Sequence, residues 1–152
     1  MSATWVVRDR DLEQNPHGRS LLPSVGRTGS PPPTHNGQVD TVPLFDARAR
    51  VLADLQARHH ATPQAVSILE DAVAAREWWA DQWPEGQVYV AGLVAQDVQD
   101  GLFEAVGRWP LCLGCPGPEH SLYIQPDLGG PDPVWVCEES GDVVAPLGGL
   151  GD

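Results

Sequence analysis

The density of proline and glycine limits the possible folds of this chain more than any other feature. The 152 residues include 15 prolines and 16 glycines, and residues 21–37 are especially rich in both. Proline has no backbone N–H and a fixed φ, and glycine favours turns, so this stretch cannot sustain a helix or an inner strand. We therefore expect residues 1–42 to form an extended arm that is either disordered or draped over a partner.

Apolar residues recur at helical spacing after this arm. Positions three or four apart in sequence lie on the same face of an α-helix, and Pro43 suits the first turn of one. A first helix is therefore predicted over residues 43–60. Its apolar face is made by Leu44, Phe45, Val51, Leu52 and Leu55.

Two more helices are predicted in the next stretch. Thr62 suits an N-cap, and the sequence Pro84-Glu85-Gly86 ends the second helix. Residues 87–106 combine a short strand-like run with apolar residues at helical intervals, and we favour a third helix that ends at Gly107. The prediction for residues 43–107 is a small helical bundle. The apolar face of its second helix contains Val66, Leu69, Val73, Ala80 and Trp83.

The pattern changes after residue 107. Short apolar runs at 121–125, 134–137 and 142–145 are separated by turn residues. They predict a two- or three-stranded β meander over residues 108–147, which is too small to be stable without a staple. Residues 148–152 are predicted to form a flexible tail. The predicted fold class is therefore α+β, a small helical bundle followed by a stapled β module.

The staple is predicted from three cysteines and one histidine. Cys112 and Cys115 form a C-x-x-C pair with Gly114 between them, His120 follows, and Cys137 lies within a predicted strand. A tight turn lets two thiolates face one ion, and tetrahedral Zn²⁺ takes thiolate and imidazole ligands. A hairpin that returns Cys137 beside Cys115 completes a Cys₃His site.

This arrangement resembles a zinc ribbon across residues 109–147. The resemblance implies a structural Zn²⁺ ion held by Cys112, Cys115, Cys137 and a fourth ligand, either His120 or an acid such as Asp142. A zinc ribbon usually has a second paired knuckle, but here Ser140 stands three residues after Cys137. Two other interpretations remain open: inert reduced cysteines, and a redox-active pair. The redox interpretation lacks a helix after C-x-x-C, because Pro-Gly-Pro follows.

Charge and composition narrow the classes of partner. Residues 59–152 contain two arginines against fifteen acidic residues, and the chain contains no lysine. This balance argues against nucleic acids and anionic membranes as partners. The start of the chain lacks a secretory signal, no apolar run reaches the length of a membrane span, and the thiols are expected to stay reduced. We expect a cytoplasmic protein, or one in a phage particle assembled there, from a GC-rich bacterial or phage genome.

The motifs of common enzyme classes are absent from the sequence. There is no Walker loop, no G-x-S-x-G, no H-E-x-x-H and no deaminase H-x-E signature. We therefore predict a non-enzymatic interaction or assembly protein, a subunit or adaptor of a larger bacterial or phage complex. Its protein partner or second copy would meet the N-terminal arm and the body that bears Trp78, Trp79 and Trp83. A small zinc-dependent enzyme is the alternative, and a nucleic-acid-binding regulator that uses the zinc module is the third hypothesis.

Overall fold

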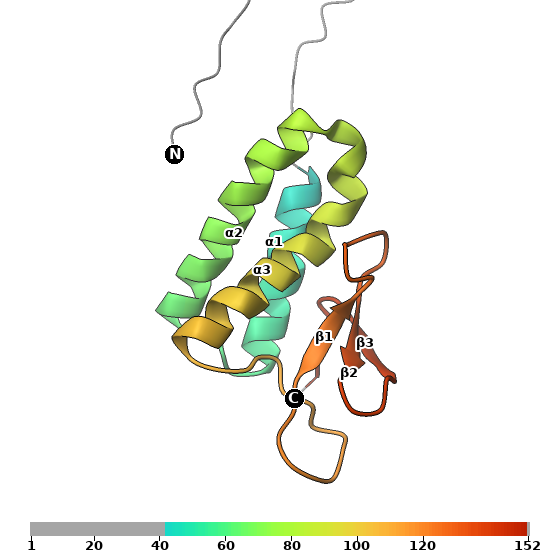
Figure 1. The fold of residues 1–152 in the computed structure, drawn as a ribbon. Helices are drawn as coiled ribbons and strands as arrows, with labels where there is room; N and C mark the ends of the chain where they lie inside the picture. Colours follow the sequence, from blue (N-terminus) through green and yellow to red (C-terminus); the bar gives the residue numbers. More distant parts are fainter. Residues whose placement is uncertain (1–41, 152) are drawn as a thin grey trace, which may run out of the picture. The chain divides into compact units, whose positions relative to one another are not determined.

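The computed structural model describes residues 42–151, so the predicted arm lies outside the described residues except for Val42. Three helices are followed by a three-stranded antiparallel sheet (Figure 1). This order confirms the predicted α+β class. The elements are α1 (Val42–Ala57), α2 (Pro63–Gln82), the 3₁₀ helix η1 (Pro84–Tyr89), α3 (Val90–Ala105), β1 (Leu122–Gln125), β2 (Val134–Cys137) and β3 (Val143–Pro146).

The ends of the helices follow local sequence signals. The Thr62 hydroxyl accepts a hydrogen bond from the backbone N–H of Ala65 at 3.2 Å, which caps the start of α2. After α3, Gly107 has φ +109° and its N–H donates to the carbonyl of Leu102. The stretch predicted as one helix over residues 87–106 is divided, because the chain passes through η1 before α3 begins at Val90.

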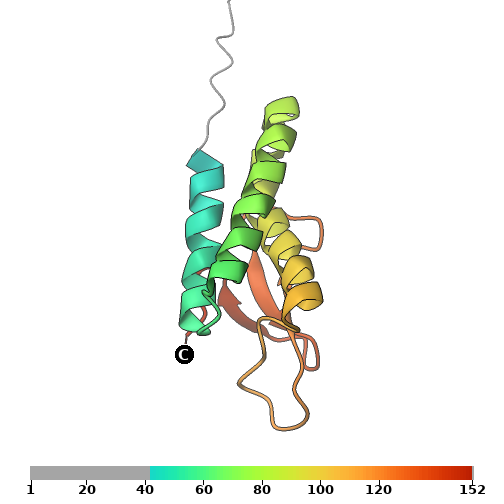
Figure 2. The same cartoon turned by 90° about the vertical axis from the view of Figure 1, so that its left-hand side faces the viewer.

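The buried apolar residues form one core that spans the helices and the sheet. It includes Val51 and Leu55 of α1, and Leu122 and Trp135 of the strands, each completely shielded from solvent. The sheet lies on one side of the helical bundle (Figures 1 and 2). Leu122 and Ile124 of β1 and Trp135 of β2 are buried in this core, whereas Val143 and Val144 of β3 are exposed. Among the described helices, none is long and apolar enough to span a membrane.

Two predicted core residues are exposed instead. Phe45 is 68% exposed, because the buried stripe of α1 runs through Leu44, Ala47 and Val51 and the next helical position points away from it. Trp83 is 44% exposed because α2 ends at Gln82, which leaves this tryptophan outside the regular helix.

The strands form a meander with the order β1-β2-β3. The register of the first pair places Leu122 opposite Cys137, and a β-bulge lies between Trp135 and Val136 in the second pair. The strands coincide with the three short apolar runs that predicted a two- or three-stranded meander. The register matters for the site, because it brings the end of β2 beside the segment that precedes β1.

The residues predicted as a flexible tail contact α1. Leu150 is buried, and the N–H groups of Gly148 and Leu150 donate to the carboxylate of Asp54 at 2.7 and 2.9 Å. Gly148 has φ +83°, and a Cβ at this position would lie 3.0 Å from a side-chain carbon of Arg50. The backbone therefore approaches α1 too closely for a larger residue, and residues 148–150 are part of the packed structure.

Candidate metal centre

The first two candidate ligands lie in a loop that is closed at its base. The backbone N–H of Cys112 donates to the carbonyl of His120 at 3.0 Å, and Leu111 forms an isolated antiparallel bridge with Ser121. These contacts hold the start of the loop beside its end. Cys112, Cys115 and His120 are therefore presented by one short segment immediately before β1.

The remaining ligand comes from β2. Cys137 is the last residue of that strand and pairs with Leu122, which lies two residues after His120. The antiparallel register thus returns Cys137 to the base of the loop. Cys137 and His120 are both buried, while Cys112 and Cys115 are partly exposed.

The four side chains converge on one point. Their ligand atoms all lie within 4.8 Å of one another. The Sγ atoms of Cys115 and Cys137 are 3.6 Å apart, and His120 Nε2 lies 3.2 Å from Cys137 Sγ. A tetrahedral ion with Zn–S bonds of about 2.3 Å sets its sulfur ligands about 3.8 Å apart. The spacing therefore suits a tetrahedrally coordinated ion, and it is far from that of a disulfide.

Hydrogen bonds orient two of the ligands from outside the cluster. His120 Nδ1–H donates to the carbonyl of Pro118 at 3.1 Å, which leaves Nε2 unprotonated and facing the sulfurs in the neutral ring. The backbone N–H of Ser140 donates to Cys137 Sγ at 3.4 Å. Such contacts fix the tautomer of a metal-binding histidine and stabilise a ligating thiolate.

The same contacts shift the acidity of the ligands. Hydrogen bonds from the side chain and backbone of Ser140 lower the pKa of the Cys137 thiol to about 6. The hydrogen bond to Pro118, assisted by Cys137, raises the pKa of His120 to about 9. The neighbouring Cys137 and Cys112 raise the pKa of Cys115 to about 11. The cluster therefore holds a thiolate at neutral pH and has at least two protons, on Cys115 and His120, for a metal ion to displace.

The structure brings His120, rather than Asp142, together with the three cysteines. Asp142, the other candidate, is not among the four residues whose ligand atoms converge in the described part of the chain. Ser140, whose side chain is a poor zinc ligand, contacts the cluster through its backbone N–H, which donates to Cys137 Sγ. The chemistry of three thiolates and one imidazole suits a soft or borderline divalent cation.

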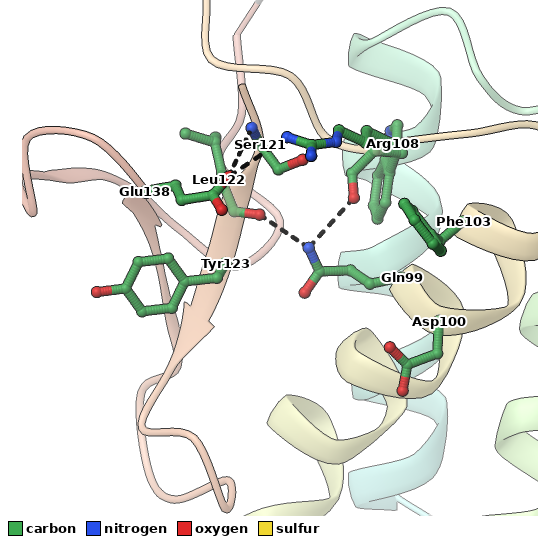
Figure 3. A pocket seen from close by; sticks show the side chains of 9 residues that line it. Gln99, Asp100, Phe103, Arg108, Ser121, Leu122, Tyr123 and Glu138 are labelled. Atoms are coloured by element: carbon green, nitrogen blue, oxygen red, sulfur yellow. Dashed lines mark hydrogen bonds and ion pairs between the residues drawn. The ribbon is translucent and has the colours of Figure 1, made fainter. Parts of the chain in front are cut away.

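A shallow groove separates α3 from β1 close to this centre. It has a volume of about 360 Å³ and lies between Phe103 on α3 and Tyr123 on β1 (Figure 3). Gln99 spans its floor, since Nε2 donates to the carbonyls of Trp109 and Leu122 at 3.1 and 2.9 Å. Gln99 therefore ties α3 to both ends of the segment that holds Cys112, Cys115 and His120.

Fold and site together define an α+β domain with a Cys₃His cluster, at the base of its sheet, that could hold a metal ion. A family model described as a domain of unknown function, DUF8819, matches residues 40–147. The chain belongs to this family, whose match covers all the helices, all three strands and the four candidate ligands. Neither a curated protein nor a solved structure matches the chain.

Proposed function

We propose that this protein is a non-enzymatic interaction or assembly protein with a structural zinc ion bound by Cys112, Cys115, His120 and Cys137. Thiolate and imidazole ligands at tetrahedral spacing favour Zn²⁺ over the hard cations Mg²⁺ and Ca²⁺. Four protein ligands fill a tetrahedral site, whereas catalytic zinc keeps one position for water or substrate. The zinc-dependent enzyme is therefore the weaker hypothesis.

The observation that carries an interaction role is a group of exposed tryptophans at the end of α2. The tryptophan patch consists of Trp78, Trp79, Trp83 and Tyr89. Trp78 is 69% exposed and Trp83 is 44% exposed. Large aromatic side chains exposed to water are costly for a protein on its own and are typical anchors at protein interfaces.

Contacts within the tryptophan patch give it a defined shape. The rings of Trp79 and Trp83 meet edge to face at 5.0 Å, and Trp83 stacks on Tyr89 at 5.5 Å. A rigid aromatic surface loses little side-chain entropy when it binds. Arg76, which lines a cavity with Trp78 and Trp79, is engaged by Asp97 at 2.6 Å, so this arginine is not an available cation of the kind that a nucleic-acid surface interleaves with its aromatic residues.

The partner is therefore expected to be a protein, and the chain would act as an adaptor or subunit of a larger assembly. Reduced thiols are needed to bind the metal, which supports a reducing compartment such as the cytoplasm, or a phage particle assembled there. A regulator that binds nucleic acid through the metal module has less support, because residues 109–147 contain neither arginine nor lysine.

Native mass spectrometry of the protein isolated from its source organism tests the proposal, because it reports bound metal and bound partners together. We expect zinc and at least one protein partner or a second copy. Trp78→Ser should abolish the complex, whereas Val143→Ser, which changes a 64% exposed residue on β3, should preserve it. A zinc-loaded monomer with no protein partner would overturn the interaction role, and equal complexes from both variants would exclude the tryptophan patch as the interface.

A further inference from the structure

A second cavity, separate from the groove between α3 and β1, lies beside the loop that contains Cys112. It has a volume of about 230 Å³ and is formed by the end of α1 and by the residues on either side of Cys112. Its apolar walls are Ala57, Leu111 and Leu113, and its polar groups come from Arg58, His59, His60 and Trp109. This volume is smaller than the ~300–1,000 Å³ of typical drug-sized ligand pockets.

Arg58 differs from the other described arginines. Its Nε and Nη1 atoms are buried and have no hydrogen-bond partner. Arg58 as a whole is half-buried, but guanidinium nitrogens that are shielded from water and lack an acceptor cost free energy, because they lose hydrogen bonds to water and gain none in return. In residues 42–151 every other arginine pairs with a carboxylate: Arg48 with Glu70, Arg50 with Asp46, Arg76 with Asp97 and Arg108 with Glu138.

Trp109 adds a second unpaired donor to the same cavity. The side chain is 2% exposed, and its indole Nε1–H has no acceptor. Buried indole N–H groups usually find one. The cavity contains no acidic residue, although the chain from residue 59 onward carries fifteen. Two residues from distant segments, each with an unpaired buried donor, therefore line one cavity that has no acidic residue among its described lining.

Other cavities on the described surface differ from this one, because each has a carboxylate beside its arginine. Three of them also contain an arginine, and each contains the carboxylate that neutralises it: Arg108 with Glu138, Arg76 with Asp97, and Arg50 with Asp46. In the cavity beside the metal loop, the acceptor has to come from outside the described residues.

We propose that this cavity binds a carboxylate carried on a short aliphatic stem. The carboxylate accepts hydrogen bonds from the Arg58 guanidinium and the Trp109 indole, and Ala57, Leu111 and Leu113 cover the stem. A free organic acid and the C-terminal carboxylate of a polypeptide both have this chemistry. This inference is independent of the proposed protein interface, because it concerns residues at the end of α1 and around Cys112, whereas the tryptophan patch lies at the end of α2 and on η1.

Hexanoate and its neutral counterpart hexanamide are suitable probes for the zinc-loaded full chain. Isothermal titration calorimetry should detect hexanoate and not hexanamide, and the affinity from acetate to hexanoate should rise by up to about fourfold per methylene. Nuclear magnetic resonance should show a shift of the Trp109 indole N–H on binding. Equal binding of acid and amide, or no binding of any carboxylate at millimolar concentration, would overturn the proposal.

Matched variants test whether hexanoate binds in this cavity or responds only to the positive charge of the protein surface. Arg58→Gln should lower hexanoate affinity at least tenfold, whereas Arg50→Gln, within the preceding helix α1, should leave it unchanged. Leu113→Ala should weaken hexanoate more than acetate, because only the longer acid contacts the apolar wall. A peptide with a free C-terminal leucine, compared with its amide, distinguishes the two sources: tighter binding than hexanoate indicates a polypeptide terminus, and weaker binding a small acid. If Arg58→Gln binds hexanoate as tightly as the unmodified chain, the proposal fails.

Discussion

The indole Nε1–H of Trp135 on β2 donates to the carboxylate of Asp54 on α1 at 2.6 Å, across 81 positions of sequence. Both side chains are completely buried. The same carboxylate accepts the backbone N–H groups of Gly148 and Leu150. One acidic side chain therefore joins the first helix, the central strand and the end of the chain, and all three contacts are charge-assisted.

Replacing Asp54 should destabilise the whole domain. Asp54→Ala removes the acceptor for three donors, and each buried donor left without a partner costs about 1–3 kcal/mol. We expect a loss of about 3 kcal/mol or more in the free energy of unfolding, measured by urea denaturation. Asp46→Ala on the same helix removes only an exposed pair with Arg50 and should cost about 1 kcal/mol or less. Equal effects of the two changes would contradict this role for Asp54.

The elements of this fold were predictable because each has a short-range signal. Helical spacing of apolar residues, the Thr62 cap and the Gly107 stop are local in sequence. The short apolar runs of the three strands, separated by turn residues, are local as well. Asp54 has no such signal. Aspartate on a helix is usually solvent-exposed, and the three donors that Asp54 accepts from lie more than 80 positions away. Its role follows only from tertiary packing.

The candidate site was predictable for a related reason. The C-x-x-C pair, His120 and Cys137 are residue types with specific metal chemistry, and a hairpin was enough to bring them together. The orienting groups could not be predicted, because they are backbone atoms of Pro118 and Ser140. Arg58 was missed as well, since an arginine at a helix end is ordinary until its partners can be inspected.

Metal content distinguishes the ligands directly. The purified protein should contain about one zinc ion per chain, measured by atomic spectrometry on protein without an affinity tag. Cys112→Ser and His120→Ala should each lose most of the metal, because each removes one of four converging donors. Asp142→Asn should retain it. Zinc retained by His120→Ala and lost from Asp142→Asn would show that the acid is the fourth ligand.

Zinc uptake should release protons at neutral pH. The raised pKa values of His120, about 9, and Cys115, about 11, keep both groups protonated at pH 7, and the metal must displace both protons. Cys137, with a pKa near 6, adds a further proton only at lower pH. Apparent zinc affinity should therefore fall as pH falls, and more steeply below pH 6. Calorimetry in buffers of different ionisation enthalpy should give at least two protons at pH 7; release of fewer than one would contradict the shifts.

Gln99 should control both stability and metal retention. Its amide holds the carbonyls of Trp109 and Leu122, which belong to buried residues and bracket the metal-binding loop (Figure 3). Gln99→Ala leaves both carbonyls without this donor and should lower the free energy of unfolding by about 2 kcal/mol or more.

The consequence for the metal follows from the position of those carbonyls. When the ends of the loop are no longer tied to α3, its three ligands are less well ordered, so zinc should transfer to a competing chelator several-fold faster. Asp100→Ala changes the adjacent, exposed residue at the edge of the same groove and provides the matched control, with little effect on either measurement. Faster metal loss in Gln99→Ala at unchanged stability would place its effect in the loop alone. Unchanged metal transfer in a destabilised variant would instead show that the loop keeps its geometry without α3, because the hydrogen bond between Cys112 and His120 is sufficient to close it.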